Sequence, residues 1–283
     1  MDARDREFLR EYTQFSGLNH IVTAVALYNA GRHADGTAAR LIQEVDLLGA
    51  KEAADSAGHL NEGARVQTVV VGRLVLELVA AIEDVAGLAW AIRERKAGLL
   101  SRYMWSSVGE AAMLLDRACQ DPRPDLTELL RLPPIAAIKA SLDERAARAI
   151  ELDYTSMPSR FAQMGDLYRR RIFESVTSTA LNDQPPEDSL YVVLDLLDDS
   201  TRVPSPKGTF VDAYNKLKHR FTVVEKLSEL GPGIRYAHFG RDPRSVRDLY
   251  DQVIFVSKIG LELAHILAAI ADAGLDEPAE ATA

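Results

Sequence analysis

Cysteine is almost absent from this chain: Cys119 is the one thiol among 283 residues. A lone cysteine cannot form an internal disulfide, which favours a reducing compartment. The N-terminal stretch MDARDREFLREY is charged throughout and lacks the apolar core of a signal peptide. The sequence therefore predicts a cytoplasmic protein that does not depend on disulfides.

Several catalytic and metal-binding motifs are missing as well. The chain has no glycine-rich phosphate loop, no G-x-S-x-G elbow and no dinucleotide-binding fingerprint. Glu262 and His265 have the E-x-x-H spacing of a di-iron bundle, but the sequence contains no second copy. His20, His33 and His59 stand apart, without the cysteine or carboxylate spacing of a zinc site. We therefore expect no metal and no cofactor.

The longest apolar run, Val66 to Ile92, is the strongest candidate for a membrane span in the sequence. It carries four charged residues: Arg73, Glu77, Glu83 and Asp84. A bilayer core penalises each central charge by about 2.5–3.5 kcal/mol. The run is therefore interpreted as a buried helix, and no membrane partner is expected.

Charged residues on a buried helix need partners. Arg73, Glu77, Asp84 and Arg95 fall on one stripe, which predicts an internal ladder of ion pairs. The alternative is that Glu77 or Asp84 meets a basic group outside this helix, in Lys216–Arg220 or Arg169–Arg171. A carboxylate beside His219 would favour the charged imidazole, which suits the binding of a phosphate.

Helical periodicity runs through almost every segment between the loop signals. Helices are expected over residues 4–30, 36–57, 64–97, 101–119, 125–131, 134–153, 158–182, 209–230 and 243–273. Residues 188–199 are interpreted as a short helix rather than a strand, and 231–243 as a loop. The pattern predicts an all-α multi-helix bundle of about eight to ten helices, without a sheet of more than two or three strands.

Residues 1–275 are expected to form a single all-α domain. The connector at 183–208, which is rich in proline and serine, is the place where a subdivision would fall. Residues 276–283, DEPAEATA, are acidic and lack bulky apolar side chains, so this tail is expected to be disordered.

The charge is distributed unevenly along the chain. The formal net charge is -9, yet Arg202–Arg244 contains nine Lys or Arg residues against four Asp or Glu, a local balance of +5. The remainder must then carry -14. Nonspecific binding of a polyanion over the whole surface is not expected, but this basic segment, Arg202–Arg244, could hold a phosphate.

Within the basic segment, the stretch AYNKLKHRF (213–221) separates into two faces if it is helical. Phe210, Leu217, Phe221 and Val224 share an apolar stripe. Asn215 and His219, four residues apart, become neighbours on the opposite side, flanked by Lys216 and Lys218. This face is either a solvated surface or a binding surface.

The stretch YNKLKH resembles the signature of HEPN domains, helical domains associated with nucleotide binding and RNA cleavage in prokaryotic defence and toxin systems. That signature has an arginine, a polar residue, three further residues and a histidine. Asn215 matches the polar residue and His219 the histidine, while Tyr214 stands where the family has its arginine. The resemblance implies a HEPN-like C-terminal half and a homodimer.

The resemblance further implies a candidate site that binds nucleotide or RNA phosphate. Asn215, His219 and Arg220 are its candidate catalytic residues, and Lys216, Lys218 and His238 its candidate ligand-binding residues. His219 would act as general acid or base in a metal-independent RNA cleavage. Because Tyr214 replaces the arginine, a second reading stays open, in which the protein is a noncatalytic interaction module that contacts a partner protein or its own second copy.

Overall fold

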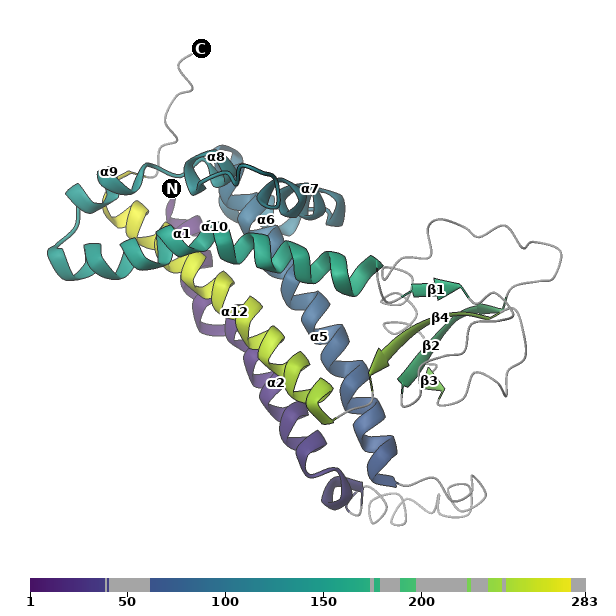
Figure 1. Ribbon diagram of the computed structural model, residues 1–283. Helices are drawn as coiled ribbons and strands as arrows, with labels where there is room; N and C mark the ends of the chain where they lie inside the picture. The colour runs from purple at the N-terminus through teal and green to yellow at the C-terminus, as the bar shows by residue number, and fades with distance from the viewer. Residues whose placement is uncertain are drawn as a thin grey trace. The chain divides into compact units, whose positions relative to one another are not determined.

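The structure is a computed structural model that describes residues 1–38, 40, 62–173, 176–178, 189–196, 223–224, 234–240 and 243–275. This part of the chain contains nine α-helices, labelled α1 to α12 in Figure 1, and four strands. The prediction of a multi-helix bundle is confirmed. The candidate residues Asn215, Lys216, Lys218, His219 and Arg220 lie outside the described residues.

The chain divides into two compact units, each made of separate stretches of sequence. Unit 1 comprises Met1–Ile21, Ala80–Tyr168 and Ile254–Ala283, and unit 2 comprises Val22–Val79 and Arg169–Val253. The expected single domain over residues 1–275 stays a prediction, as does the disordered tail, which lies outside the described residues.

Unit 1 contains the short helices of the bundle: α1 (Ala3–Glu11), α6 (Leu99–Met104), α7 (Val108–Ala118), α8 (Leu126–Leu130) and α9 (Ile135–Ala140). Side-chain caps start three of them. Asp2 and Asp125 accept hydrogen bonds from backbone N–H groups at the first turns of α1 and α8. Ser107 and Glu110 form a capping box at α7.

Four longer helices have residues in both units: α2 (Gly17–Arg32), α5 (Glu62–Arg93), α10 (Glu144–Phe173) and α12 (Pro243–Asp272). A short π-helix, Tyr12–Ser16, joins α1 to α2. The helices predicted for 64–97 and 243–273 are confirmed by α5 and α12. Leu74, Leu78 and Ile82 of α5 are almost fully buried, and each such side chain stabilises the fold by about 1.5–3 kcal/mol.

The two helices predicted for 134–153 and 158–182 are divided differently in the structure. α9 ends at Ala140, and α10 runs through Pro158, which was expected in a first turn. An interior proline removes one backbone hydrogen bond. The helix continues because one apolar stripe is buried on both sides of the proline: Ile150, Tyr154, Met157, Phe161 and Met164.

Unit 2 contains a sheet that helical periodicity did not predict. Its strands are β1 (Val176–Ser178), β2 (Ser189–Leu196), β3 (Val223–Val224) and β4 (Ile234–Gly240), and all pairs are antiparallel in the order β1-β4-β2-β3. The expectation of at most two or three strands was therefore wrong by one strand.

Four local predictions are corrected by this sheet. Residues 176–178 form a strand inside the helix predicted over 158–182. Residues 189–196 form a strand rather than a short helix, and 234–240 form a strand inside the expected loop. The helix predicted over 209–230 is contradicted at Val223 and Val224, which pair with Val192 and Tyr191. The physical reason is non-local pairing: a segment with β-branched residues becomes a strand when a partner strand is present.

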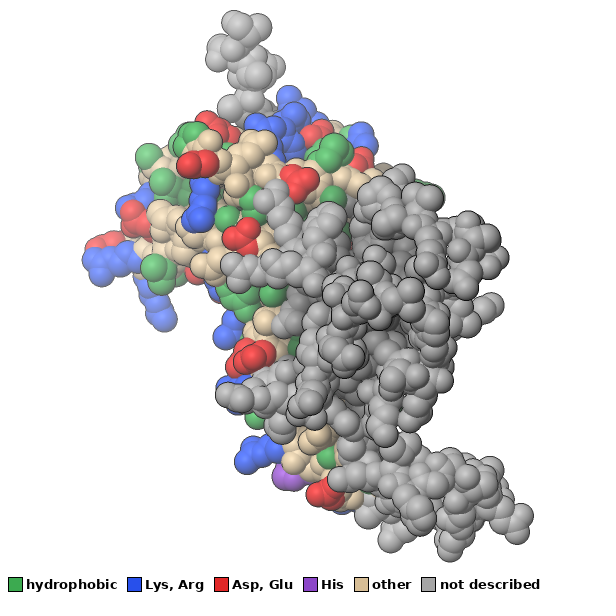
Figure 2. All heavy atoms as spheres, turned by 45° about the vertical axis from the view of Figure 1, so that its right-hand side comes forward, with side chains coloured by type: hydrophobic (Ala, Val, Ile, Leu, Met, Phe, Trp, Pro, Cys, Tyr) green, Lys and Arg blue, Asp and Glu red, His purple; other side chains and the backbone are tan. Residues whose placement is uncertain are grey.

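The space-filling view shows Lys and Arg side chains interspersed with Asp and Glu over the described part of the face that is turned to the viewer (Figure 2).

One stretch of α12, Val246–Asp272, is long and apolar enough to cross a membrane by length and composition. More than half of the stretch is buried, as in the core helix of a soluble protein, so this is weak evidence for a membrane.

Candidate functional site

The predicted site residues fall almost entirely outside the described residues. Asn215, Lys216, Lys218, His219 and Arg220 are among the residues that the structure leaves out, so their grouping stays a prediction. His238 is placed by its backbone. It lies on β4 opposite Tyr191 of β2, and not in the loop where it was expected.

In unit 1, the Asp84 cluster is formed by Asp84 of α5, Tyr12, Tyr103 and His20. The Tyr12 hydroxyl donates to Asp84 Oδ2 at 2.7 Å, and the Tyr103 hydroxyl donates to Asp84 Oδ1. His20 Nε2 lies 3.7 Å from Asp84 Oδ2. The Asp84 side chain is only 13% exposed, and both of its oxygens are satisfied. The cluster thus holds one carboxylate in a largely buried position.

Close helix packing positions Tyr12 against Asp84. Gly260 of α12 faces this site, and a Cβ there would lie 2.7 Å from Tyr12 Oη and 2.8 Å from Val85 Cγ2. Contacts this short are not tolerated, so the missing side chain allows α12 to approach α5 and the π-helix. Tyr12 also packs edge-to-face with Tyr103, at 6.0 Å between ring centroids.

The two tyrosines of the Asp84 cluster remain protonated donors. Burial raises the pKa of Tyr12 well above its usual value, and the charge of Asp84 raises it further. The same two causes raise the pKa of Tyr103. Both hydroxyls therefore keep donating to Asp84 over the whole physiological pH range.

A cavity of about 300 Å³ opens beside the Asp84 cluster. It is lined by Glu83, Asp84, Gly87, Tyr103, Met104, Ser106, Ser107 and Ala111. Two carboxylates line it, so it suits a cation or a hydrogen-bond donor and disfavours a phosphate. Two large apolar side chains at this cavity are mostly exposed. Met104, which lines it, is 67% exposed, and the adjacent Trp105 is 84% exposed.

Among the described residues, the partners of Asp84 are Tyr12, Tyr103 and His20. The hypothesis that Glu77 or Asp84 meets a basic group in Lys216–Arg220 stays a prediction, because that stretch lies outside the described residues. Sequence reasoning identified Asp84 as a buried charge that needs a partner, and it missed the two tyrosines. The only sequence signal for these tyrosines was their aromatic character, in two short segments that are separate from the helix of Asp84.

The E-x-x-H motif from the sequence, Glu262 and His265, lies on α12. Glu262 forms an ion pair with Arg160, whose guanidinium lies 5.9 Å from the centre of the Phe255 ring. His265 is exposed on α12. Among the described residues, no group of three or more His, Cys, Asp or Glu side chains is arranged to hold a metal ion.

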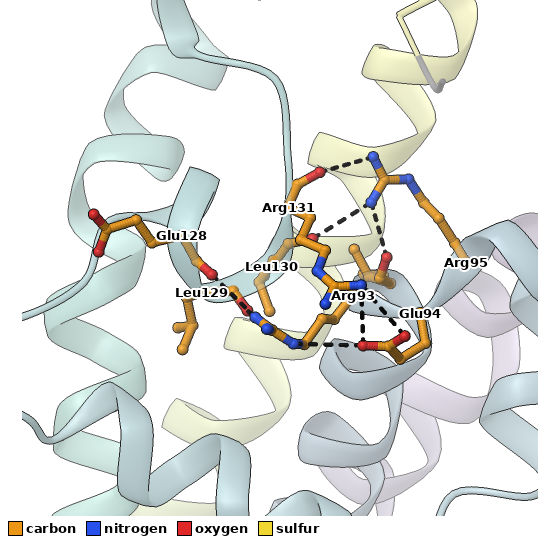
Figure 3. A network of polar contacts seen from close by, with 8 residues as sticks. Arg93, Glu94, Arg95, Glu128, Leu129, Leu130 and Arg131 are labelled. Atoms are coloured by element: carbon orange, nitrogen blue, oxygen red, sulfur yellow. Dashed lines mark hydrogen bonds and ion pairs between the residues drawn. The ribbon is translucent and has the colours of Figure 1, made fainter. Parts of the chain in front are cut away.

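Arg93 and Arg95 have a structural role at the end of α8 (Figure 3). Arg93 Nη1 donates to the carbonyl oxygens of Glu128 and Leu129, the latter at 2.6 Å. Arg95 is buried and donates to the carbonyls of Leu130, Arg131 and Ile92. The last carbonyls of a helix have no partner within it. Arg95 thus satisfies backbone carbonyls at the end of α8, and its place in the predicted ladder of ion pairs stays a prediction.

Comparison of the chain with protein-family models, with curated proteins and with solved structures found no match.

Proposed function

We propose that the chain is a HEPN-like protein that binds nucleotide or RNA phosphate through its NKLKH stretch, Asn215–His219, and the adjacent Arg220. The observation that carries this proposal is the basic segment, with a balance of +5 inside a chain of net charge -9. Lys216, Lys218 and Arg220 concentrate positive charge within five residues. Such local charge binds a phosphate backbone by releasing its counterions.

The acidic cavity of unit 1 supports this location of the phosphate site indirectly. Glu83 and Asp84 line that cavity, and like charges repel a phosphate. Within the described residues, Asp84 already pairs with Tyr12, Tyr103 and His20. We therefore expect the phosphate to bind at the basic NKLKH stretch rather than in this cavity.

Binding to a fluorescent single-stranded RNA oligonucleotide, measured by anisotropy at several salt concentrations, tests the proposal. Each phosphate contact contributes a slope of about -0.7 to log K against log salt. The double variant Lys216→Glu, Lys218→Glu should weaken binding and reduce the slope by about 1.4. The matched control is Lys96→Glu, an exposed lysine in unit 1, which should leave both unchanged. Binding that is absent at low salt, or insensitive to salt, overturns the proposal.

RNA cleavage is the catalytic form of this proposal. The 2′-hydroxyl would attack the adjacent phosphate, and the bond to the 5′-oxygen would break, giving a 2′,3′-cyclic phosphate. His219 would take the proton of the 2′-hydroxyl as general base or give one to the leaving 5′-oxygen as general acid, and a neighbouring cation would stabilise the developing charge. Incubating RNA with wild-type protein and with His219→Ala, in the presence of a chelator, separates the two forms. Cleavage that His219→Ala abolishes supports a ribonuclease. RNA that stays intact with both proteins indicates binding without cleavage.

A second candidate function, a noncatalytic interaction module that pairs with its own second copy, is favoured by one observation. Trp105 and Met104 are large apolar side chains that stay mostly exposed beside a cavity. Exposed aromatic anchors of this kind mark protein interfaces. Light scattering tests it: a dimer that becomes a monomer with Trp105→Ser supports a homodimer through this surface. A wild-type monomer, or a dimer unchanged by Trp105→Ser, contradicts it.

A further inference from the structure

In unit 2, the Arg247 cluster joins α2 and α12 at the surface. The rings of Tyr28 and Tyr250 stack, with centroids 4.6 Å apart and an interplanar angle of 28°. The guanidinium of Arg247 lies over both rings, 5.5 Å from the centre of Tyr28 and 5.7 Å from that of Tyr250. The two helices that carry the cluster lie side by side in Figure 1, as this stacking requires.

Two hydrogen bonds fix the plane of the Arg247 guanidinium. Nε donates to Asp251 Oδ2 at 2.8 Å, and Nη1 donates to Tyr28 Oη at 3.4 Å. In the part of the chain that the structure describes, Nη2 has no hydrogen-bond partner. The Arg247 side chain is 58% exposed. The guanidinium is therefore held beside the two stacked rings, and the side chain remains exposed.

The surrounding sequence holds the Arg247 cluster in place. Arg247, Tyr250 and Asp251 are three and four residues apart on α12, so they share one helix face. One turn after Tyr28, Gly31 allows close packing: a Cβ there would lie 3.0 Å from Val70 Cγ1 and 3.2 Å from Val246 Cγ1. The backbones that carry the two tyrosines and the arginine are thus fixed by core contacts.

Such an arrangement is suited to an unpaired nucleobase. Bases in single-stranded RNA stack on aromatic rings and on arginine planes. Asp251 neutralises the charge of Arg247, so the cluster offers a flat surface rather than a net charge for a phosphate. The basic segment ends at Arg244, three residues before Arg247 in the sequence, and it supplies the charge that the cluster lacks.

We propose that the Arg247 cluster is a stacking site for one base of single-stranded RNA. The inference rests on the proposed function: the basic segment binds phosphates, and the Arg247 cluster binds a base of the same strand. Arg247 is a binding residue in this proposal, and Tyr28 and Tyr250 position its guanidinium. Since the cluster is neutral, its contribution to affinity should not depend on salt.

The test uses full-length protein and two RNA oligonucleotides of equal length, one with normal bases and one with abasic positions. Arg247→Lys keeps the charge but loses the plane. We expect this variant to bind normal RNA about tenfold more weakly than wild type, from the strength of base stacking, with an unchanged salt slope. Wild type should also prefer normal over abasic RNA, and Arg247→Lys should lose most of this preference.

Two controls keep the two proposals separable. Arg145→Lys, the same substitution at an exposed arginine of unit 1, should leave the affinity unchanged, and thermal melting verifies that each variant is folded. If wild type binds no RNA, both proposals fail. If wild type binds RNA with a salt slope, but without a preference for bases and without loss in Arg247→Lys, the stacking site alone is overturned.

Discussion

The two units use the same residue types in opposite ways. In unit 1, Arg95 is buried and its guanidinium donates to backbone carbonyls, while Tyr12 is 1% exposed and its hydroxyl donates to Asp84. In unit 2, Arg247 lies at the surface beside two stacked tyrosines, and its side chain is 58% exposed. Residue type alone therefore does not indicate a binding role.

The buried residues of unit 1 and the exposed Arg247 of unit 2 differ in how many of their polar atoms have a hydrogen-bond partner within the fold. A buried polar group without a partner costs free energy, so unit 1 pairs these groups internally. An exposed arginine pair contributes little to stability, because water competes with it. The difference gives an experimental criterion: substitutions in the Asp84 and Arg95 networks should affect stability, and substitutions in the Arg247 cluster should affect binding.

The largest effect on stability is expected for Asp84→Ala. It leaves the hydroxyls of Tyr12 and Tyr103 without their acceptor, and each unsatisfied buried group costs about 1–3 kcal/mol. We expect the free energy of unfolding to fall by about 3 kcal/mol in urea denaturation. The control Asp35→Ala, at an exposed position, should change little. Equal stabilities for the two variants would show that the Asp84 cluster is not a structural network.

The next largest effect on stability is expected from a comparison of two arginines, Arg95 and Arg247. Arg95→Ala removes a donor from the carbonyls of Leu130 and Arg131 at the end of α8, and about 2 kcal/mol of stability should be lost. Arg247→Ala should leave the urea midpoint unchanged, since the side chain is exposed. Arg145→Ala serves as an exposed control in unit 1. The comparison fails if Arg247→Ala destabilises the protein as much as Arg95→Ala.

Alanine substitutions at two glycines should change the stability of the protein in opposite directions. A Cβ at Gly260 would lie within 2.8 Å of Tyr12 Oη and Val85 Cγ2, so Gly260→Ala should overpack unit 1 and cost about 2 kcal/mol. In unit 2, no atom of the described residues lies within 4 Å of a Cβ at the helical Gly36, and Gly36→Ala should stabilise by about 0.5 kcal/mol. Thermal melts of both variants measure this. A stable Gly260→Ala protein would mean that α12 shifts freely at this contact.

The helices of the core could be predicted because their signals are local. Pro243 opens α12, and the apolar stripe of α5 continues for about nine turns without a break signal. The sheet could not be predicted in this way. Val192 pairs with Ala237, 45 residues later, and a nine-residue run such as SLYVVLDLL fits a helix or a strand equally well by itself. The partner strand decides between them.

The site was predictable to a smaller extent. The sequence identified Asp84 as a buried charge that needs a partner, but Tyr12 lies 72 residues away, in an unrelated segment. The Arg247 cluster depends on Tyr28, 219 residues from Arg247, and no spacing rule connects them. For the NKLKH stretch, the outcome rests on experiment, because those residues lie outside the described part of the chain.

A destabilisation smaller than those at Asp84, Arg95 and Gly260 is expected in the capping box of α7, near the cavity of unit 1. Glu110 accepts hydrogen bonds from the backbone N–H and the hydroxyl of Ser107, which lower the pKa of Glu110 below its usual 4.5. A carboxyl with a lowered pKa in the folded state stabilises the protein above its unfolded pKa, and this contribution is lost as the pH falls through the folded value. The return bond, from the backbone N–H of Glu110 to Ser107 Oγ, does not titrate.

Ser107→Ala should therefore cost about 1 kcal/mol at pH 7, the usual value of an N-cap. The difference from wild type should shrink when urea denaturation is repeated below pH 4, because protonated Glu110 no longer gains from the box in the wild-type protein. Ser101→Ala, an exposed serine on α6, is the matched control and should show no change of its effect with pH. An identical difference at pH 3 and pH 7 would show that the bond from the Ser107 hydroxyl to the Glu110 carboxylate does not contribute to stability.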